Sequence, residues 1–500
     1  MIWHIFKKDW KLTWWMVLGA ALLYAMRVVA LSRAAFVNAR TSAEPNVGYV
    51  LTTLSMVATA LLVVIIVQKD AIAGLRQDWL VRPIERTDLL LSKLAFVVLL
   101  VQGPIFVLDI AEGLAGGLGI VHVVAAAASR SVWTLATMVL PLIAFAALTR
   151  NLMEAIGAGF AVGLAFGLLQ SATVNTSAAI AERSGIGWIL SSMQSVCVLL
   201  FVLAILGLQY YRRKVIASRW ICGAAVVAAF AIQFVPWQQV FAIQERFSSN
   251  PGAASAIQVH SGSGGGADLN GTSDNQVFLM VPVMFSGVGL GERVVEDRVS
   301  ARIIEPSGEV TRLTDAWGSV YPVSSSAQTV ERLYMPKELV GPLKRHPVRM
   351  EMDLSLTLMK PGSEKTMPAD GTAELGDGRG RCALRTNFEA SQVEVRCRVA
   401  GKVPCALWQL HEATGKTGHS PRFDCNGDYS PWKASVESGA ISAVNMNLPF
   451  RFGPRIGDPE MEPADEADMK GAQVFVQTWE PVAHFTRQLV IPDFRLGKRP

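Results

Sequence analysis

Apolar residues are concentrated in the first half of this chain, where they form runs long enough to cross a membrane as helices. The hydrocarbon core of a bilayer is about 30 Å thick, and a helix needs about 20 apolar residues to span it. Seven runs come close to that length: 13–31, 47–67, 89–108, 132–149, 153–171, 189–210 and 217–235. The sequence therefore predicts an α-helical integral membrane domain with about seven transmembrane helices over residues 13–235.

The positive charges in the short loops indicate how the chain is oriented. Cytoplasmic loops carry an excess of Lys and Arg. One side of the predicted spans holds Lys7, Lys8, Lys11, Lys69, Arg76, Arg82, Arg86, Lys93, Arg150, Arg212, Arg213, Lys214 and Arg219, and the other holds Arg33, Arg40, Arg130 and Arg183. We therefore expect a cytoplasmic N-terminus and an extracytoplasmic C-terminal domain. The expected compartment is a bacterial inner membrane, which would make that domain periplasmic.

Residues 1–12 are predicted to form an amphipathic helix in the cytoplasmic interface. Aromatic and aliphatic side chains would share one face, and lysines would point towards the headgroups. The apolar face would hold Ile2, Trp3, Phe6, Trp10 and Trp14, and the basic face Lys7, Lys8 and Lys11. The alternative is a short basic flank of the first span.

The loop between the second and third spans, residues 68–93, is longer and more charged than a simple connection requires. Gly74 lies inside a charged stretch of helical character, which Pro83 ends because proline biases the preceding residue away from helical geometry. Thr87 or Asp88 can then cap the helix that enters the membrane. This pattern predicts a short helix on the cytoplasmic face between two spans. The alternative is a basic loop that only fixes the topology.

This loop resembles the second-to-third-span loop of ABC-2 type transporter permeases. The elements similar to that family are, in chain order, Lys69-Asp70, Gly74, Trp79-Leu80, Pro83, Arg86, Leu89-Leu90-Leu91 and Lys93. The order of an interfacial helix followed by six spans is similar as well, over roughly residues 1–212. A seventh span and a large C-terminal domain depart from the family pattern.

The resemblance implies that the loop is a coupling helix that docks on a separate ATPase subunit, and that this chain is the permease subunit of an ATP-driven exporter. It also implies a second permease subunit, homo- or heterodimeric, and ATP and magnesium bound to the ATPase rather than to this chain. Trp79 is the expected apolar anchor. The residues expected to take part in coupling are Asp70, Gly74, Arg76, Asp78, Trp79, Arg82, Pro83, Glu85, Arg86 and Lys93.

No ATPase or other enzymatic motif is recognisable in the sequence itself. Thr414-Gly415-Lys416-Thr417 approaches a phosphate-binding loop, but Leu410 stands where the first glycine is required. His411-Glu412 lacks the second histidine of a zinc-protease motif. We therefore expect no catalytic, metal or cofactor site in this chain. A net charge of +5 without a dense basic stripe gives no indication of nucleic-acid binding.

Small residues recur along the span predicted at 153–171. Gly159, Gly163 and Gly167 have four-residue spacing, which lets two helix backbones approach closely. The spacing predicts helix packing, either at a dimer interface or inside one subunit.

Ionisable residues within the spans are few and lie towards their outer ends. A charge at the centre of a span is costly, so Arg27, Asp109 and Glu112 are expected to be boundary residues, or to line a substrate exit. The apolar stretch 117–129 is closed by Arg130, which predicts an interfacial segment leading into the fourth span.

Beyond the spans the pattern becomes typical of strands. Residues 236–275 include a Ser/Gly-rich stretch and predict a flexible linker. Apolar and polar residues alternate over 348–358, which indicates a strand with one buried and one solvent-facing side. Similar stretches separated by turn residues predict an all-β region made of two β-sandwich modules, over 276–362 and 372–500.

Cysteine positions support an extracytoplasmic location for this β region. Cys382, Cys397, Cys405 and Cys425 all lie in it, and an even number outside the cytoplasm indicates disulfides. The preferred pairing is Cys382–Cys397 with Cys405–Cys425, and two other pairings stay open. Cys197 and Cys222 fall within spans, where they are expected to act as apolar residues.

Two functions of different classes follow from the sequence. The first is the exporter subunit described above. In the second, the spans only anchor an extracytoplasmic β-sandwich binding or scaffold protein that transports nothing itself. The structured cytoplasmic loop favours the first function, and the large outer region favours the second.

Overall fold

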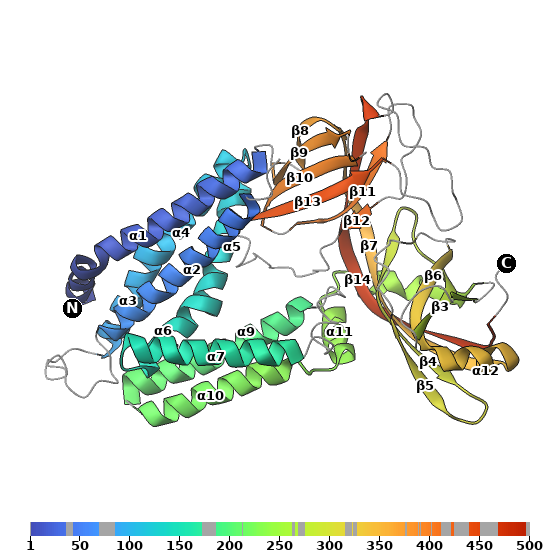
Figure 1. The fold of residues 1–500 in the computed structure, drawn as a ribbon, viewed down its shortest axis with the longest axis horizontal. Coiled ribbons are helices and arrows are strands. Elements are labelled where there is room, and N and C mark those ends of the chain that lie inside the picture. Colours follow the sequence, from blue (N-terminus) through green and yellow to red (C-terminus); the bar gives the residue numbers. More distant parts are fainter. Residues whose placement is uncertain are drawn as a thin grey trace.

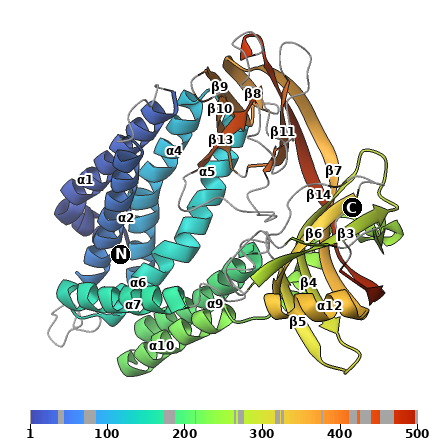
Figure 2. The same ribbon diagram turned by 45° about the vertical axis from the view of Figure 1, so that its right-hand side comes forward.

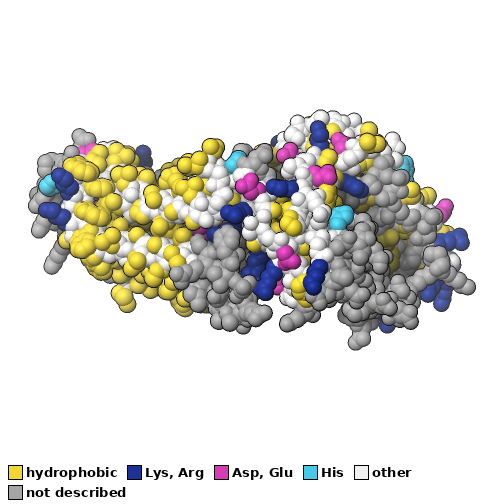
Figure 3. Space-filling model, turned by 90° about the horizontal axis from the view of Figure 1, so that it is seen from above, with side chains coloured by type: hydrophobic (Ala, Val, Ile, Leu, Met, Phe, Trp, Pro, Cys, Tyr) yellow, Lys and Arg dark blue, Asp and Glu magenta, His cyan; other side chains and the backbone are white. Residues whose placement is uncertain are grey.

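A computed structural model describes most of the chain. The described residues are 2–36, 44–69, 86–172, 187–212, 214–262, 266–268, 276–315, 323, 328–375, 378–388, 390, 392–401, 403–411, 422–424, 440–450 and 469–496. Helices form the N-terminal part and antiparallel sheets the C-terminal part (Figure 1). Hydrophobic side chains dominate the visible surface of the helical part, whereas charged side chains are scattered over the β part (Figure 3). The chain therefore combines a membrane-like helical region with a β-rich region.

The helical part contains α-helices, several of which continue into short π-helical segments. In chain order its elements are α1 (Ile2–Phe36), α2 (Glu44–Gln68), α3 (Arg86–Phe96), η2 (Val97–Gln102), α4 (Gly103–Ala115), α5 (Ile120–Thr134), η3 (Leu135–Val139), α6 (Leu140–Leu148), α7 (Leu152–Ala172), α9 (Gly187–Gly207), η4 (Leu208–Arg212), α10 (Val215–Ile232) and α11 (Trp237–Glu245). The segments η2 and η3 lie just before Pro104 and Pro141, whose missing N–H groups each remove one helical hydrogen bond.

Six helical segments of the described residues are long and apolar enough to cross a membrane. They are Ile2–Ala30, Val50–Gln68, Thr87–Ala115, Ile120–Leu148, Gly187–Arg212 and Val215–Ile232. The remaining predicted span, 153–171, corresponds to α7, whose described apolar stretch is the shorter Leu152–Leu164. The described residues thus support about six spans, against about seven predicted.

Two segments that the sequence predicts as interfacial belong to longer helices. The helix expected over 1–12 continues into the first span as α1, since no proline or glycine interrupts it before Gly19. Residues 117–129 are not a separate segment, because α5 begins at Ile120 and continues through Arg130. Arg130 does not end the helix because its side chain is buried and ion-paired.

The described β part has two antiparallel sheets. Its elements are η5 (Pro251–Ala256), β1 (Gln258–Ser261), β2 (Gly266–Asp268), β3 (Gln276–Ser286), β4 (Arg293–Ile304), β5 (Val310–Asp315), β6 (Gln328–Pro336), η6 (Lys337–Leu339), α12 (Val340–Arg345), β7 (Val348–Pro368), β8 (Gly371–Leu375), β9 (Gly380–Asn387), β10 (Gln392–Ala400), β11 (Cys405–His411), β12 (Arg422–Asp424), β13 (Ile441–Pro449) and β14 (Gln473–Phe494). The large sheet has ten strands, in the order β1-β3-β6-β5-β4-β7-β14-β11-β12 with β2 on β3. The small sheet has four, in the order β13-β10-β9-β8.

Two long paired strands, β7 and β14, run through both predicted modules. The sequence predicts a division between 362 and 372, but β7 continues to Pro368 without a break. Pro361 is tolerated inside the strand because the β7–β14 register shifts between Gln477 and Trp479, where an interstrand hydrogen bond is dispensable. The two modules are therefore joined by a continuous pair of strands rather than by a loop.

The two modules bury their cores in different ways. In the second, Val393 and Val395 of the small sheet share a core with Trp408 and Val476 of the large sheet, which is a sandwich arrangement. In the first, the only sheet that contributes described core residues is the large one, Ala254 of η5 and Leu343 of α12 add to the core, and β1 contacts β14. Alternation in the sequence identifies the buried side of each strand. It does not show whether a second sheet or the curled end of the same sheet covers that side.

The strand predicted over 348–358 is the start of β7, and its apolar side is buried as expected. Its other side is only partly solvent-facing: Arg349 is exposed, but Glu351, Ser355 and Thr357 are buried. Arg302 and Arg349 pair with Glu351 at 2.5 and 2.7 Å. This strand lies between β4 and β14, so Glu351 and Thr357 reach polar side chains of those neighbouring strands.

The segment after the last span is ordered where the sequence predicts a flexible linker over 236–275. Residues 237–261 include α11, η5 and β1. Arg487 of β14 donates hydrogen bonds to the carbonyls of Ile257 at 2.8 Å and Ala254 at 2.6 Å, which fixes η5 on the large sheet. Residues 263–265 and 269–275 lie outside the described residues.

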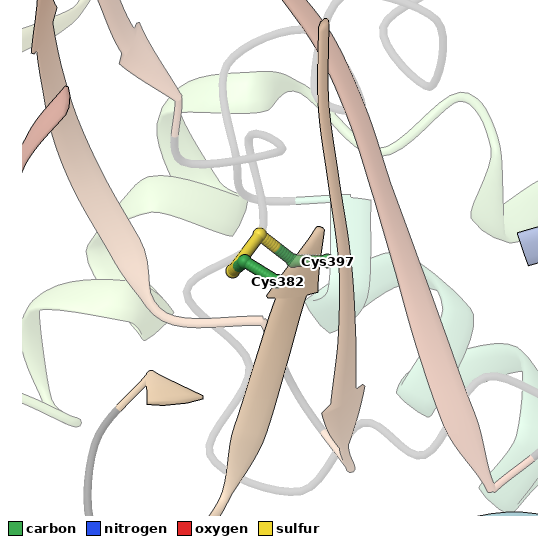
Figure 4. Close-up of a disulfide and its surroundings, with 2 residues drawn as sticks. All are labelled: Cys382 and Cys397. Carbon is green, nitrogen blue, oxygen red and sulfur yellow. A yellow bond between two sulfur atoms is a disulfide. The ribbon is translucent and has the colours of Figure 1, made fainter. Parts of the chain in front are cut away.

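A disulfide joins the two central strands of the small sheet. Cys382 of β9 and Cys397 of β10 lie opposite each other and are bonded (Figure 4), which confirms the first predicted pair. Cys405 is also disulfide-bonded, and Cys425 lies outside the described residues. Cys197 and Cys222 are free. Because disulfides persist in oxidising compartments, the bond is consistent with an extracytoplasmic β part.

Candidate functional site

Most of the predicted coupling loop lies outside the described residues. This applies to Asp70, Gly74, Arg76, Asp78, Trp79, Arg82, Pro83 and Glu85, and to the side chain of Arg86. The structure does describe both ends of the loop, at the end of α2 and the start of α3. The contacts at these two ends decide what a movement of the loop could displace.

The exit of the loop is fixed to α1 by a buried ion pair. Lys93 Nζ of α3 lies 2.7 Å from Asp9 Oδ2, and both side chains are 1% exposed. Thr13 donates a hydrogen bond to the Asp9 carbonyl at 2.7 Å. Lys93, which the sequence predicts as a coupling residue, is therefore buried in the ion pair rather than exposed to a docked protein, and it fixes the position of α3 relative to α1.

The entrance of the loop is fixed to a different group of helices. Gln68 at the end of α2 donates from Nε2 to Thr149 Oγ1 at 2.7 Å and to the Asn151 carbonyl at 3.1 Å, both in the turn between α6 and α7. Arg219 of α10 in turn pairs with Glu154 of α7 at 2.8 Å. The two ends of the loop are thus connected to α1 on one side and to α6, α7 and α10 on the other.

A polar network is buried among α1, α4 and α5 towards their outer ends. Tyr24 donates to Asp109 Oδ1 at 2.6 Å, and Arg130 Nη1 contacts both carboxylate oxygens at 2.6 and 2.5 Å as well as the Tyr24 hydroxyl. Asp109 is fully buried. The sequence predicts boundary residues here, whereas the structure places Arg27, Asp109 and Glu112 inside the protein. Arg27 and Asp109 reach polar groups on neighbouring helices, and Glu112 reaches Arg398 of strand β10.

The first outer junction joins α4 and α5 to the small sheet (Figure 2). Glu112 of α4 and Arg398 of β10 form a buried ion pair at 3.7 Å. Burial lowers the pKa of the Arg398 guanidinium, and the negative charge of Glu112 offsets part of that effect. The Gly119 N–H donates to the Gly378 carbonyl at 2.8 Å.

The turn between α4 and α5 allows close packing against this sheet. Gly117 has a φ of 74°, and a Cβ atom there would lie 2.5 Å from Arg381 Nη1 of β9. Apolar side chains of both parts complete the contact: Leu118, Val123, Ala126, Ala127, Ala400, Ala440 and Ile441. The small sheet is therefore docked on the helices by charge, backbone and apolar contacts together.

The second outer junction joins α9 and α11 to the large sheet through a buried hydrogen-bond chain. Trp188 Nε1 donates to Gln244 Oε1 at 2.8 Å, and Gln244 Nε2 lies 2.8 Å from His484 Nε2. His484 Nδ1 lies 2.7 Å from Thr357 Oγ1, which donates to Asp297 Oδ2 at 2.5 Å. Since the Thr357 hydroxyl donates its proton to Asp297, it can only accept a hydrogen bond from His484. His484 therefore carries its proton on Nδ1, and its Nε2 accepts from Gln244.

Replacing Gln244 by leucine is expected to destabilise the protein by about 1–3 kcal/mol, because Trp188 and His484 would each lose a buried hydrogen-bond partner. Denaturant unfolding of the full chain in detergent measures the change. Gln238→Leu, at an exposed position of the same helix, is the matched control and should change the free energy of unfolding by less than about 0.5 kcal/mol. Equal effects of the two substitutions would contradict the hydrogen-bond chain.

The glycines of α7 that are predicted to pack against another helix have almost no contact with the described residues of their own chain. A Cβ atom at Gly163 or Gly167 would meet nothing within 4 Å, and one at Gly159 would only reach Phe145 at 4.0 Å. Of the two alternatives that the sequence leaves open, this arrangement favours a surface available to another helix over packing inside one subunit.

Several residues at these junctions were not identified from the sequence. Asp9 carries a recognisable signal, since Ile5, Asp9, Thr13 and Val17 follow one another at four-residue spacing and all are buried. An acid on such a face predicts a buried partner. His484 carries no such signal, because its partner Gln244 is far away in the chain.

Comparisons with known proteins do not assign this chain to a family. No protein-family model matches it, and no curated protein matches its sequence. Among solved structures, the crystal structure of red sea bream transglutaminase aligns with 9% sequence identity and a TM-score of 0.11, covering 52% of this chain and 33% of that chain. The chain thus spans about a third of that protein's length. A similarity this low carries no argument about fold or function.

Proposed function

We propose that this chain is the permease subunit of an ATP-driven exporter of the ABC-2 type, coupled to a separate ATPase through residues 68–93. The ATPase would bind ATP and magnesium, and a second permease subunit would complete the transporter in a bacterial inner membrane. The observation that carries the proposal is the continuous helical segment Thr87–Ala115, which leads from the loop to the β part.

This segment supports coupling because it makes buried contacts near both of its ends. Lys93 pairs with Asp9 near the loop, and Glu112 pairs with Arg398 of β10 at the other end. Packed helices shift as units rather than deforming continuously. When the ATPase closes and displaces the loop, α3 and α4 would move together, and the small sheet would follow α4 through Arg398.

Co-purification with an ATPase from the native host tests the proposal. The tagged full chain should retain a Walker-motif ATPase in mild detergent, identified by mass. The Trp79→Ala/Arg82→Ala variant should bind at least about tenfold less of it, since buried Trp and Arg anchors contribute most to such interfaces. Trp220→Ala, at a 78% exposed tryptophan of α10, is the matched control and should retain the ATPase. Full retention by the double variant would refute the assigned loop.

The second candidate is a membrane-anchored extracytoplasmic binding or scaffold protein without transport of its own. The observation that favours it is the firm attachment of the β part at two junctions, centred on Arg398 and His484. An anchor needs that rigidity but no ATPase. Recovery of the tagged chain without an ATPase, with the β part folded, would support this candidate over the exporter.

A further inference from the structure

Arg27 is a buried arginine near the outer end of α1. It is 2% exposed, its Nε donates to Thr52 Oγ1 of α2 at 3.0 Å, and its guanidinium lies 4.9 Å from the Tyr24 ring. Among the described residues, Nη1 is buried without a hydrogen-bond partner. An arginine near the end of a span ordinarily extends to the headgroup region. An inward guanidinium that is only partly satisfied therefore requires a physical reason.

Charge pairing leaves Arg27 without a carboxylate. The buried charged side chains described at the outer ends of the helices and on adjoining β10 are Arg27, Arg130, Arg398, Asp109 and Glu112. Asp109 pairs with Arg130, and Glu112 with Arg398. Both carboxylates thus have an arginine partner. Glu112 also lies close enough to interact with the charge of Arg27, but no carboxylate of the described part lies within ion-pair distance of Arg27. Buried charges in proteins are normally paired, so the missing group is an anion.

The neighbouring surface indicates what carries that anion. Met26 and Val29 of α1 are 42% and 52% exposed, and Leu54 of α2 is 48% exposed. Within this apolar surface, Thr53 is exposed and Thr52 is half-buried, so the hydroxyl that accepts the Arg27 hydrogen bond belongs to a partly exposed residue of α2. Arg27 and Thr52 lie within the segments Ile2–Ala30 and Val50–Gln68, which are long and apolar enough to span a membrane. A ligand reaching Arg27 from this side combines a negative headgroup with a hydrocarbon tail.

We propose that Arg27 binds the anionic headgroup of an amphiphile, a phosphate or carboxylate whose hydrocarbon tail lies along the apolar faces of α1 and α2. The headgroup oxygens would accept hydrogen bonds from Nη1, and the planar guanidinium suits such oxyanions. Entry is lateral, between α1 and α2, from the outer leaflet. The site does not depend on an ATPase, so it is independent of the proposed exporter function.

The test uses the full chain in nanodiscs of phosphatidylcholine, alone or mixed with phosphatidylglycerol. Phosphatidylglycerol should raise the midpoint of thermal unfolding of the wild type, and native mass spectrometry should detect the retained lipid. Arg27→Met should show no such rise and should retain the lipid about tenfold less tightly or worse. Arg219→Met, which removes a 44% exposed arginine at the other membrane face, is the matched control and should respond like the wild type.

Two results would overturn the proposal: the same phosphatidylglycerol shift in wild type and Arg27→Met, or no shift in either. Inorganic phosphate added to phosphatidylcholine nanodiscs separates the sources of the anion. If phosphate alone reproduces the wild-type shift, the ligand is a water-soluble anion and the amphiphile is refuted. If Arg27→Met does not fold, Arg27→Lys replaces it. It keeps the charge without the planar donor geometry and should retain phosphatidylglycerol more weakly than the wild type.

Discussion

Replacing Lys93 by methionine is expected to destabilise the helical region by about 3–5 kcal/mol. Asp9 would keep its charge at a position where its side chain is 1% exposed and would lose the ammonium group now 2.7 Å away. At this exposure bulk solvent compensates little of the carboxylate's charge, so the cost is that of an uncompensated buried charge. Denaturant titration of the purified full chain in detergent measures the change in the free energy of unfolding.

The double variant Asp9→Leu/Lys93→Met separates the charge effect from general loss of packing. Replacement of both partners by apolar residues of similar size is close to neutral in many proteins, so most of the lost stability should return. A double variant as unstable as Lys93→Met would contradict a cost that comes from the unpaired Asp9 charge. If Lys93→Met also weakens binding of the proposed ATPase, recovery of that binding together with stability in the double variant would show that Lys93 only positions α3.

The positions of the helices follow from the sequence because apolar runs of about 20 residues have few alternatives. The roles of charges inside those runs do not follow. Arg130 predicts the end of an apolar segment when it is considered alone, yet α5 continues through it because Asp109 of α4 neutralises it. A charge in an apolar run marks either a membrane boundary or a buried pair, and only the position of the neighbouring helix decides between them.

In the β part too, some features follow from residues that are close together in the sequence, and others depend on residues that are far apart in the chain. Alternation over 348–358 correctly identifies the buried apolar side of β7, because that pattern is local. The burial of Thr357 on the opposite side depends on His484 and Asp297 from other strands. The continuity of β7 across Pro361 likewise depends on a register shift in its partner β14. Such pairings between distant segments are what a single sequence does not specify.

Replacing Asp109 by leucine is expected to cost about 3–5 kcal/mol of stability, for the same reason as at Lys93. Here two polar groups would lose their buried partner instead of one. Arg130 would lose both of its carboxylate contacts, and the Tyr24 hydroxyl would lose its acceptor. Thermal and denaturant unfolding in phosphatidylcholine nanodiscs measure the loss. Arg130→Met should lower the free energy of unfolding by a similar amount, because it leaves the buried Asp109 carboxylate without its partner. The double variant Asp109→Leu/Arg130→Met should regain most of the stability, and a single variant as stable as the wild type would refute the pair.

The same substitution at Arg27 is expected to behave oppositely to that at Arg130. Arg130→Met leaves a buried carboxylate behind, whereas Arg27→Met leaves none, since no carboxylate of the described part lies within ion-pair distance of Arg27. In phosphatidylcholine alone, removal of an unpaired buried charge should therefore leave stability unchanged or raise it. Both guanidiniums lie near the Tyr24 ring and both variants make the same chemical change, so a difference in sign isolates pairing as the cause. Equal destabilisation by both would mean that Arg27 is already neutralised within the chain, and the proposed anionic headgroup would then be unnecessary.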